Sequence, residues 1–222
     1  MTTQQHAYWY LRERILTGLY EGGERVNPAK VADELGISRM PVREAIRQLD
    51  AEGLVTIRPN RGAIVTILTP ADIEELFEMR AVLEALAIRL AMPNLTGEAF
   101  DDLVHLRDRM ERVRGETKQW LERHHAFHDH ICRLSNRPRL TAEIARLRAA
   151  VQPYLQVYIS VHHVPEMEGY EHDTLIDAIR SRNPSVAEVC MRDHVLSAAR
   201  GVIDFLQSRN APAVTTPKRA AG

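Results

Sequence analysis

Four histidines in the C-terminal half of the sequence are spaced so that they could share one metal ion. His128, His172 and His194 each lie in or beside an apolar stripe of helical period, so each ring is expected to point inward. His124 precedes His128 by four residues, so both rings project from one helix face. A single inward histidine is usually a hydrogen-bonded core residue, and that is the alternative. Three of them on three helices favour a shared divalent cation.

Other side chains in the same half could hold a ligand. Arg80 falls within or at the edge of the apolar stripe of segment 70–91, and a buried cation needs an anion. That anion is either Glu84, one helical turn further on, or the carboxylate of a bound small molecule. Asn136 and Tyr158 are weaker candidates for the same pocket.

The two cysteines lie one helical turn from histidines. Cys132 follows His128 by four residues, and Cys190 precedes His194 by four. A thiolate could therefore enter the site, but small cysteines packing beside it are the favoured interpretation. Two cysteines do not make a disulfide framework, which indicates a reducing compartment.

A separate set of arginines suggests contact with nucleic acid. Between Ser38 and Gly53, the residues expected to cap a helix, apolar residues recur at three- and four-residue steps. Arg39, Arg43 and Arg47 recur every four residues and line a different face. The DNA major groove accepts such a helix, because arginine matches guanine edges and phosphates. The alternative is a surface helix with solvated arginines.

The flanking elements favour the DNA interpretation. Segments 4–18 and 28–35 have helical period, and a tight turn containing glycine leads into Ser38, as in a helix-turn-helix. Residues of β type then flank a turn at 59–62, which predicts a two-stranded wing with Arg61 at its tip. A wing would add a contact to the DNA backbone or minor groove, although a plain hairpin is the alternative.

Composition restricts the possible function classes. The 222 residues carry a net charge of −1, so any nucleic-acid contact must come from a local concentration of positive charge. No apolar run approaches the roughly 20 residues of a membrane span, and the N-terminus lacks a secretory signal. We expect no membrane partner and a cytoplasmic location.

From Thr69 to about residue 208 the pattern has helical period. Breaks at Pro, Gly and Asn predict a series of helices, with Pro153 kinking its own. The expected fold is mainly α, with a winged helix-turn-helix over 1–68, an all-α helical region over 69–208 and a disordered tail over 209–222. The predicted helices of the second region are 70–91, 97–114, 117–135, 138–161, 166–182 and 184–208.

The first region resembles the winged-helix domain of the GntR family of bacterial transcription regulators. The resemblance rests on residues 36–45, GISRMPVREA, on Glu52-Gly53-Leu54-Val55 and on Arg61-Gly62. It implies that Arg39 and Arg43 contact DNA and that Arg47 touches phosphate. Gly62 would let the wing tip approach the backbone, and Ser38 and Arg61 complete the predicted DNA-binding set. Met40 stands where the family commonly has Thr.

The second region resembles the FCD ligand-binding domain of the FadR branch of that family. This domain is an antiparallel helical bundle, and many members hold a divalent metal on an Asp and three His, with a small carboxylate effector on the metal. The pattern D-x-x-F-H occurs here as HHAFH at 124–128, so His124 stands in place of the Asp. His128, His172 and His194 match the three histidines. A neutral four-histidine set should favour a later metal such as zinc, nickel or copper over manganese, with zinc preferred, and should hold an anion more strongly. The family's R-x-x-x-E supports a structural Arg80–Glu84 pair.

We therefore expect a homodimeric, ligand-responsive regulator, a repressor rather than an enzyme. It would bind a near-palindromic double-stranded operator and respond to a small organic acid held at a metal site. One alternative is a metal sensor in which the ion itself is the signal. Another is a helical-bundle metalloenzyme, although the sequence shows no general base placed as in H-E-x-x-H.

Overall fold

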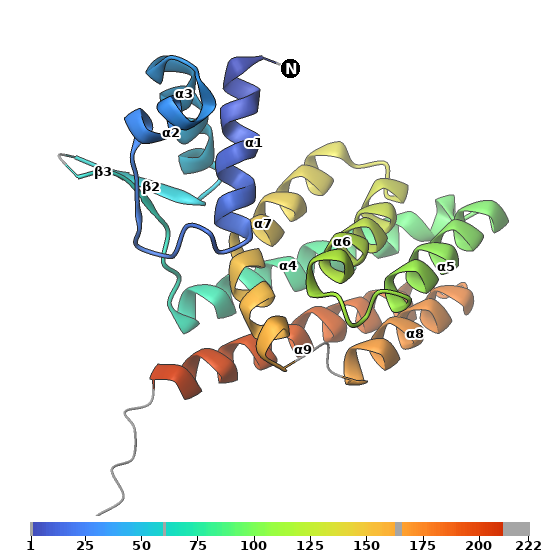
Figure 1. Ribbon diagram of the computed structural model, residues 1–222. Coiled ribbons are helices and arrows are strands. Elements are labelled where there is room, and N and C mark those ends of the chain that lie inside the picture. Colours follow the sequence, from blue (N-terminus) through green and yellow to red (C-terminus); the bar gives the residue numbers. More distant parts are fainter. Residues whose placement is uncertain (1, 60, 163–165, 211–222) are drawn as a thin grey trace, which may run out of the picture.

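The computed structural model describes residues 2–59, 61–162 and 166–210, and helices dominate it (Figure 1). In chain order the elements are α1 (Thr3–Leu16), β1 (Arg25–Val26), α2 (Pro28–Leu35), α3 (Arg39–Ala51), β2 (Val55–Arg58), β3 (Gly62–Val65), α4 (Pro70–Ala91), the 3-10 helix η1 (Met92–Asn94), α5 (Gly97–Glu111), α6 (Thr117–Leu134), α7 (Pro138–His162), α8 (Glu166–Arg180) and α9 (Pro184–Asn210).

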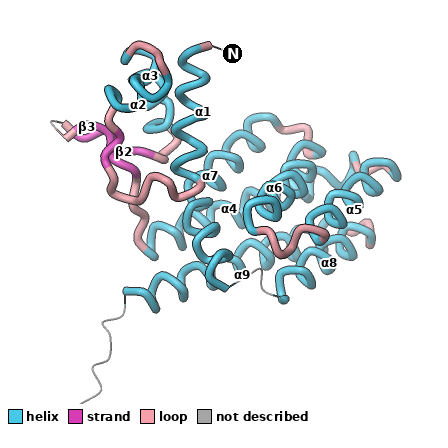
Figure 2. The backbone as a smooth tube through the Cα atoms, viewed as in Figure 1, coloured by secondary structure: helices cyan, strands magenta, loops and turns pink. Residues whose placement is uncertain are grey.

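The N-terminal part combines three helices with a small antiparallel sheet, drawn in magenta in Figure 2. β2 and β3 form the predicted hairpin, with Thr56 opposite Ile64. β1 pairs with the other edge of β3, with Val26 opposite Ala63. The sheet therefore has three strands where the sequence predicted two. The two residues of β1 are too few to show the alternation that marks a strand.

The ends of α3 follow from local chemistry. Gly36 has a φ of +65° and ends α2, which lets the chain turn directly into the next helix. Ser38 is the N-cap residue of α3, as expected, but its side chain makes no capping hydrogen bond. At the other end, Gly53 has a φ of +78° just beyond the cap residue Glu52. The predicted glycine stop is confirmed.

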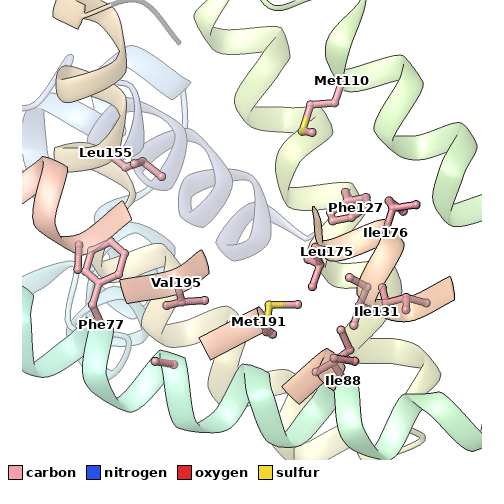
Figure 3. Packing of buried hydrophobic residues seen from close by; sticks show 14 of the residues in the cluster. Phe77, Ile88, Met110, Phe127, Ile131, Leu155, Leu175, Ile176, Met191 and Val195 are labelled. Carbon is pink, nitrogen blue, oxygen red and sulfur yellow. The ribbon is translucent and has the colours of Figure 1, made fainter. Parts of the chain in front are cut away.

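The remaining helices form a bundle in which α4 lies along α9 (Figure 1). α6 packs on α4, α5 and α7, and α8 packs on α9. α4 begins at a capping box, since Thr69 Oγ1 accepts the Asp72 N–H and the Asp72 carboxylate accepts the Thr69 N–H. Figure 3 shows how α4, α6, α8 and α9 fill one interior with apolar side chains, including Phe77, Phe127, Leu175 and Met191.

Two main hydrophobic clusters are distinct from each other. One uses buried residues between positions 7 and 65, and the other uses residues between positions 73 and 202. This arrangement accords with two folding units, although the division at residue 68 stays a prediction. Within the described ranges, no helix has the length and apolar character needed to cross a lipid bilayer.

The helix ends differ slightly from the predictions. α5 ends at Glu111, three residues early, and α9 continues to Asn210, two residues into the predicted tail. The rest of that tail, 211–222, and the predicted turn at Val164-Pro165 lie outside the described residues. Pro153 lies inside α7, and the helix continues through it.

Candidate metal centre and DNA-facing surface

α3 separates its apolar and cationic side chains as the sequence predicted. Val42 and Leu49 are fully buried against the other N-terminal helices. Arg39, Arg43 and Arg47 are all exposed, and none of them is held in an ion pair with another described residue. This face therefore presents three uncompensated positive charges on a rigid support, which is the requirement for reading DNA.

The wing adds further cations at one end of the sheet. Arg61 is exposed, and Gly62 has a φ of +77°. A Cβ atom on Gly62 would make an ordinary contact of 3.4 Å with the Nε atom of Arg25, so the positive φ is what favours glycine here. Arg25 is exposed on β1, and sequence reasoning missed it because that strand was not predicted. Asn60, in the predicted turn, lies outside the described residues.

Three helices bring the four predicted histidines to one point. α6 supplies His124 and His128, α8 supplies His172, and α9 supplies His194. One donor nitrogen from each lies within 4.8 Å of the others, and His128 Nε2 is 3.2 Å from His194 Nε2. His128, His172 and His194 are buried, whereas His124 is partly exposed. Trp120 stacks on His124, with ring centroids 4.8 Å apart.

These residues fit a tetrahedral metal ion. Two nitrogens bound to one Zn²⁺ at its usual bond length lie about 3.3 Å apart, close to the His128–His194 separation. Burial, followed by the charges of neighbouring histidines, keeps the pKa of His124 and of His128 well below the ordinary value. Both imidazoles are therefore neutral at pH 7, as ligands must be. The buried Nδ1 atom of His124 also lacks a hydrogen-bond partner among the described residues.

A buried ionic network lies behind His128. The Glu84 side chain is fully buried, and its Oε1 atom accepts hydrogen bonds of 3.1 Å from Nε of both Arg80 and Arg148. Arg148 Nη2 also donates to Glu84 Oε2 at 2.5 Å, and Nη1 donates to Asp129 at 2.8 Å. Burial alone would raise the pKa of Glu84, but the charges of Arg148 and Arg80 lower it to about 2.

Glu84 connects this network to the histidine cluster. Its Oε2 atom lies 3.6 Å from His128 Nδ1, while His128 Nε2 faces His194. This separation is longer than a hydrogen bond, so the Glu84 carboxylate would act on the imidazole through its negative charge. The sequence predicted the Arg80–Glu84 pair but missed Arg148. The available signal was the position of Arg148 between apolar residues of α7.

A small cavity adjoins the histidines. Its volume is about 20 Å³, enough for a single water-sized species. Arg80 and Trp120 share its wall with three of the histidines and with apolar residues of α7. The buried indole Nε1 of Trp120 has no hydrogen-bond acceptor among the described residues. The cavity therefore combines a cation, an unsatisfied donor and the candidate metal ligands.

Comparison with known proteins agrees with this architecture. Residues 3–65 match the family model for bacterial regulatory proteins of the gntR family, and residues 75–197 match that of the FCD domain. An uncharacterised HTH-type transcriptional regulator of Agrobacterium vitis is 37% identical over 129 residues, covering 55% of this chain and 75% of the relative. This chain belongs to the GntR family.

Other similar proteins span nearly the whole of this GntR-family chain. The Escherichia coli HTH-type transcriptional repressor GlaR is 28% identical over 208 residues, covering 88% of this chain and 93% of the relative. The structure titled E. coli McbR/YncC superposes with a TM-score of 0.79 at 22% identity, covering 95% of this chain and all of that one. That second likeness concerns the fold alone.

Two predicted pocket residues of this GntR-family protein lie away from the histidines. Asn136 is exposed, with a φ of +53°, in the turn between α6 and α7. Tyr158 packs on α9, where a Cβ atom on Gly201 would lie 2.5 Å from its hydroxyl oxygen. Neither Asn136 nor Tyr158 lines the small histidine cavity, whereas Arg80 does. The structure therefore brings one of the three predicted effector residues to the site.

The cysteines lie beside the histidine cluster and are not part of it. The group of close donor atoms in the described ranges contains four histidines and neither cysteine. Cys132 is buried at 3.5 Å from Arg148 Nη2, and burial raises the pKa of its thiol to about 11. It is therefore protonated at pH 7. Cys190 is half-buried, one turn before His194 on α9.

The lowered pKa of His125 predicts that the protein loses stability as the pH falls. Burial, followed by the charge of Arg148, lowers its pKa to about 4. Below the unfolded value of about 6.5 the unfolded chain binds this proton and the folded chain does not, so stability falls with falling pH. Between pH 6.5 and 5.5 this group should lower the unfolding free energy of the parent by about 1 kcal/mol. The His125→Gln variant should lack this part of the decrease.

Urea denaturation of chelator-treated protein at the two pH values would measure this effect. His6→Gln at an exposed position is the control and should leave the pH dependence unchanged. Equal slopes for His125→Gln and the parent would contradict the prediction.

Proposed function

We propose that this protein is a homodimeric transcriptional repressor whose operator affinity is changed by a small organic acid bound beside a metal ion. The single observation that carries the DNA-binding half is the exposed, unpaired stripe of Arg39, Arg43 and Arg47 on a helix whose other face is packed. Relatives named as transcriptional repressors support the direction of regulation.

The proposed metal is zinc, with nickel as the alternative. His124, His128, His172 and His194 would hold it through four neutral nitrogens. Such a ligand set supplies no carboxylate oxygen, so it suits zinc or nickel better than manganese. The bound ion would supply a positive centre toward which an anion is drawn, and no ligand charge would offset it.

The proposed effector is a small carboxylate. Arg80, which is paired with Glu84, and Trp120, whose indole Nε1 has no acceptor among the described residues, both line the histidine cavity and would supply positive charge and a hydrogen-bond donor to an anion. The cavity of about 20 Å³ is too small for a carboxylate, so entry requires Leu155 and Ile159 of α7 to move. α7 also contacts α1, which gives such a movement a route to the DNA-binding part.

The proposed homodimer would place two α3 helices in successive major grooves of a near-palindrome. Support comes from exposed apolar side chains on the adjacent helices α4 and α9, where Val82 is 55% and Val189 is 59% exposed. The effector would act only if its affinity differs between the DNA-competent state and another state.

Arg43→Ala tests the DNA-binding half of the proposal. An operator selected from random duplexes should bind this variant more weakly by about 1–3 kcal/mol, because a bidentate contact to a base is lost. Fluorescence anisotropy at fixed salt would give the dissociation constants. Arg109→Ala, at an exposed position on α5, is the matched control and should bind like the parent. An unchanged operator affinity for Arg43→Ala would remove this residue from the reading surface.

The metal-sensor alternative has one specific observation in its favour. The histidine cavity has room for one water-sized species, so the ion alone could be the ligand. Titrating metal-free protein and operator with Zn²⁺, with and without a panel of small organic acids, separates the two. A change in operator affinity with Zn²⁺ alone supports the sensor. A further change that requires an acid supports the effector.

A further inference from the structure

A larger cavity lies between the N-terminal part and the helical bundle. Its volume is about 500 Å³, within the range of about 300–1,000 Å³ typical of small-molecule sites. One side is formed by residues that include Gly18, Leu54 and Ile67, and the other side by residues of α7 and α9 that include Ala150 and Phe205. It is therefore walled by both of the hydrophobic units described above.

We call this space the seam cavity. Its lining disfavours the binding of charged molecules. Among the described residues that line it, Glu21 is the one carboxylate and is exposed, and no lysine or arginine is present. An anion would be transferred from water without a partner, which is strongly unfavourable. The chemistry differs from that of the histidine cavity, whose lining includes Arg80 and three histidines. The two cavities should therefore take different classes of ligand.

One hydroxyl in the seam cavity can orient a ligand. The Tyr154 hydroxyl oxygen accepts the backbone N–H of Leu68, at 2.5 Å, in the segment that joins the two parts. Burial raises the pKa of Tyr154, so the hydroxyl keeps its proton. No described residue accepts that proton, which leaves it for an acceptor inside the cavity.

We propose that the seam cavity is a second ligand site, which binds an uncharged, largely apolar molecule whose one hydrogen-bond acceptor faces the Tyr154 hydroxyl. A molecule held there contacts both parts of the chain at once. It would therefore bind best to one relative placement of the DNA-binding part and would stabilise that placement. The site is separate in position and in chemistry from the one proposed for the carboxylate.

Prodan is a suitable probe, because this uncharged naphthalene dye has one ketone oxygen and its emission shifts to the blue in apolar surroundings. Full-length protein should bind it saturably at one molecule per chain. Ala150→Trp fills the cavity and should weaken binding at least about tenfold. Tyr154→Phe removes the hydroxyl and should weaken it about threefold to tenfold. Ala145→Trp, an exposed position on the same helix outside the cavity, is the matched control and should bind like the parent.

Two further variants keep the test decisive. Val157→Phe narrows the cavity from a partly exposed position, so it serves if Ala150→Trp does not fold. His105→Ala should retain prodan binding, because His105 is exposed on α5 and lines neither cavity. Absence of saturable binding to the parent, or equal binding by the parent and both cavity-filling variants, would overturn the proposal. The readout does not involve DNA, so it stands apart from the test of the repressor function.

Discussion

Glu84→Ala should lower the free energy of unfolding by about 3–5 kcal/mol, because it leaves buried guanidinium groups without their shared counterion. Arg80 and Arg148 are each 6% exposed, and Glu84 accepts hydrogen bonds from both. Arg148 would retain Asp129, but Arg80 would lose the one carboxylate it contacts among the described residues. Urea denaturation of the metal-free protein at pH 7 would measure the loss.

Two controls distinguish the cost of leaving a buried charge unpaired from the cost of losing an ion pair. Glu143→Ala breaks the exposed pair with Arg146 and should cost at most about 1 kcal/mol. Replacing Glu84 with Leu and both buried arginines with Met should restore most of the stability, since no unpaired charge remains inside. A loss for Glu84→Ala no larger than that for Glu143→Ala would contradict the role assigned to the network.

The same carboxylate can be tested separately as a positioning group for the metal. Glu84→Gln preserves the shape of the side chain and removes the charge that lies 3.6 Å from His128 Nδ1. Zinc affinity should fall about 10-fold to 100-fold, as it does when outer-shell partners are changed elsewhere. Competition with a chromophoric chelator gives this number. A purely structural role for Glu84 would change stability and leave zinc affinity as it was.

Zinc should stabilise the folded chain by about 4 kcal/mol when its free concentration is a thousandfold above the dissociation constant. The reason is that the four converging imidazoles exist as a site only in the folded state. Native mass spectrometry should find one zinc per chain, and chelator treatment should lower the melting temperature. His172→Ala should lose the metal and the stabilisation together.

His105→Ala is the matched control for the metal prediction, because His105 is exposed on α5, away from the cluster. It should bind one zinc per chain, like the parent. Finding manganese alone, or no retained metal and no shift in melting temperature on adding zinc, would count against the four-histidine site.

Much of this arrangement could be predicted because it depends on local periodicity. The bounds of α4 were predicted correctly from the Thr69-Pro70 cap and the following apolar stripe. The arginine stripe of α3 is exposed and the predicted histidines converge, because a side chain's position along a helix decides which way it points.

Other features depend on partners far apart in the chain. The contact between Arg148 and Glu84 joins positions 64 residues apart, and no local sequence pattern predicts that the two side chains meet. Arg80 reaches the histidine cavity because α4 packs on α6. Asn136 was a weaker pocket candidate, and the turn between α6 and α7 leaves it exposed. Tertiary packing decides each of these cases.

Tyr154 and Leu155 are consecutive on α7, and each lines a different cavity. The two cavities therefore lie on different sides of α7, and this helix forms part of the wall of each. If a shift of α7 admits an acid on one side, it alters the room on the other side as well. If the apolar compound changes the protein's affinity for the acid by some factor, thermodynamic linkage requires the acid to change the affinity for the apolar compound by the same factor.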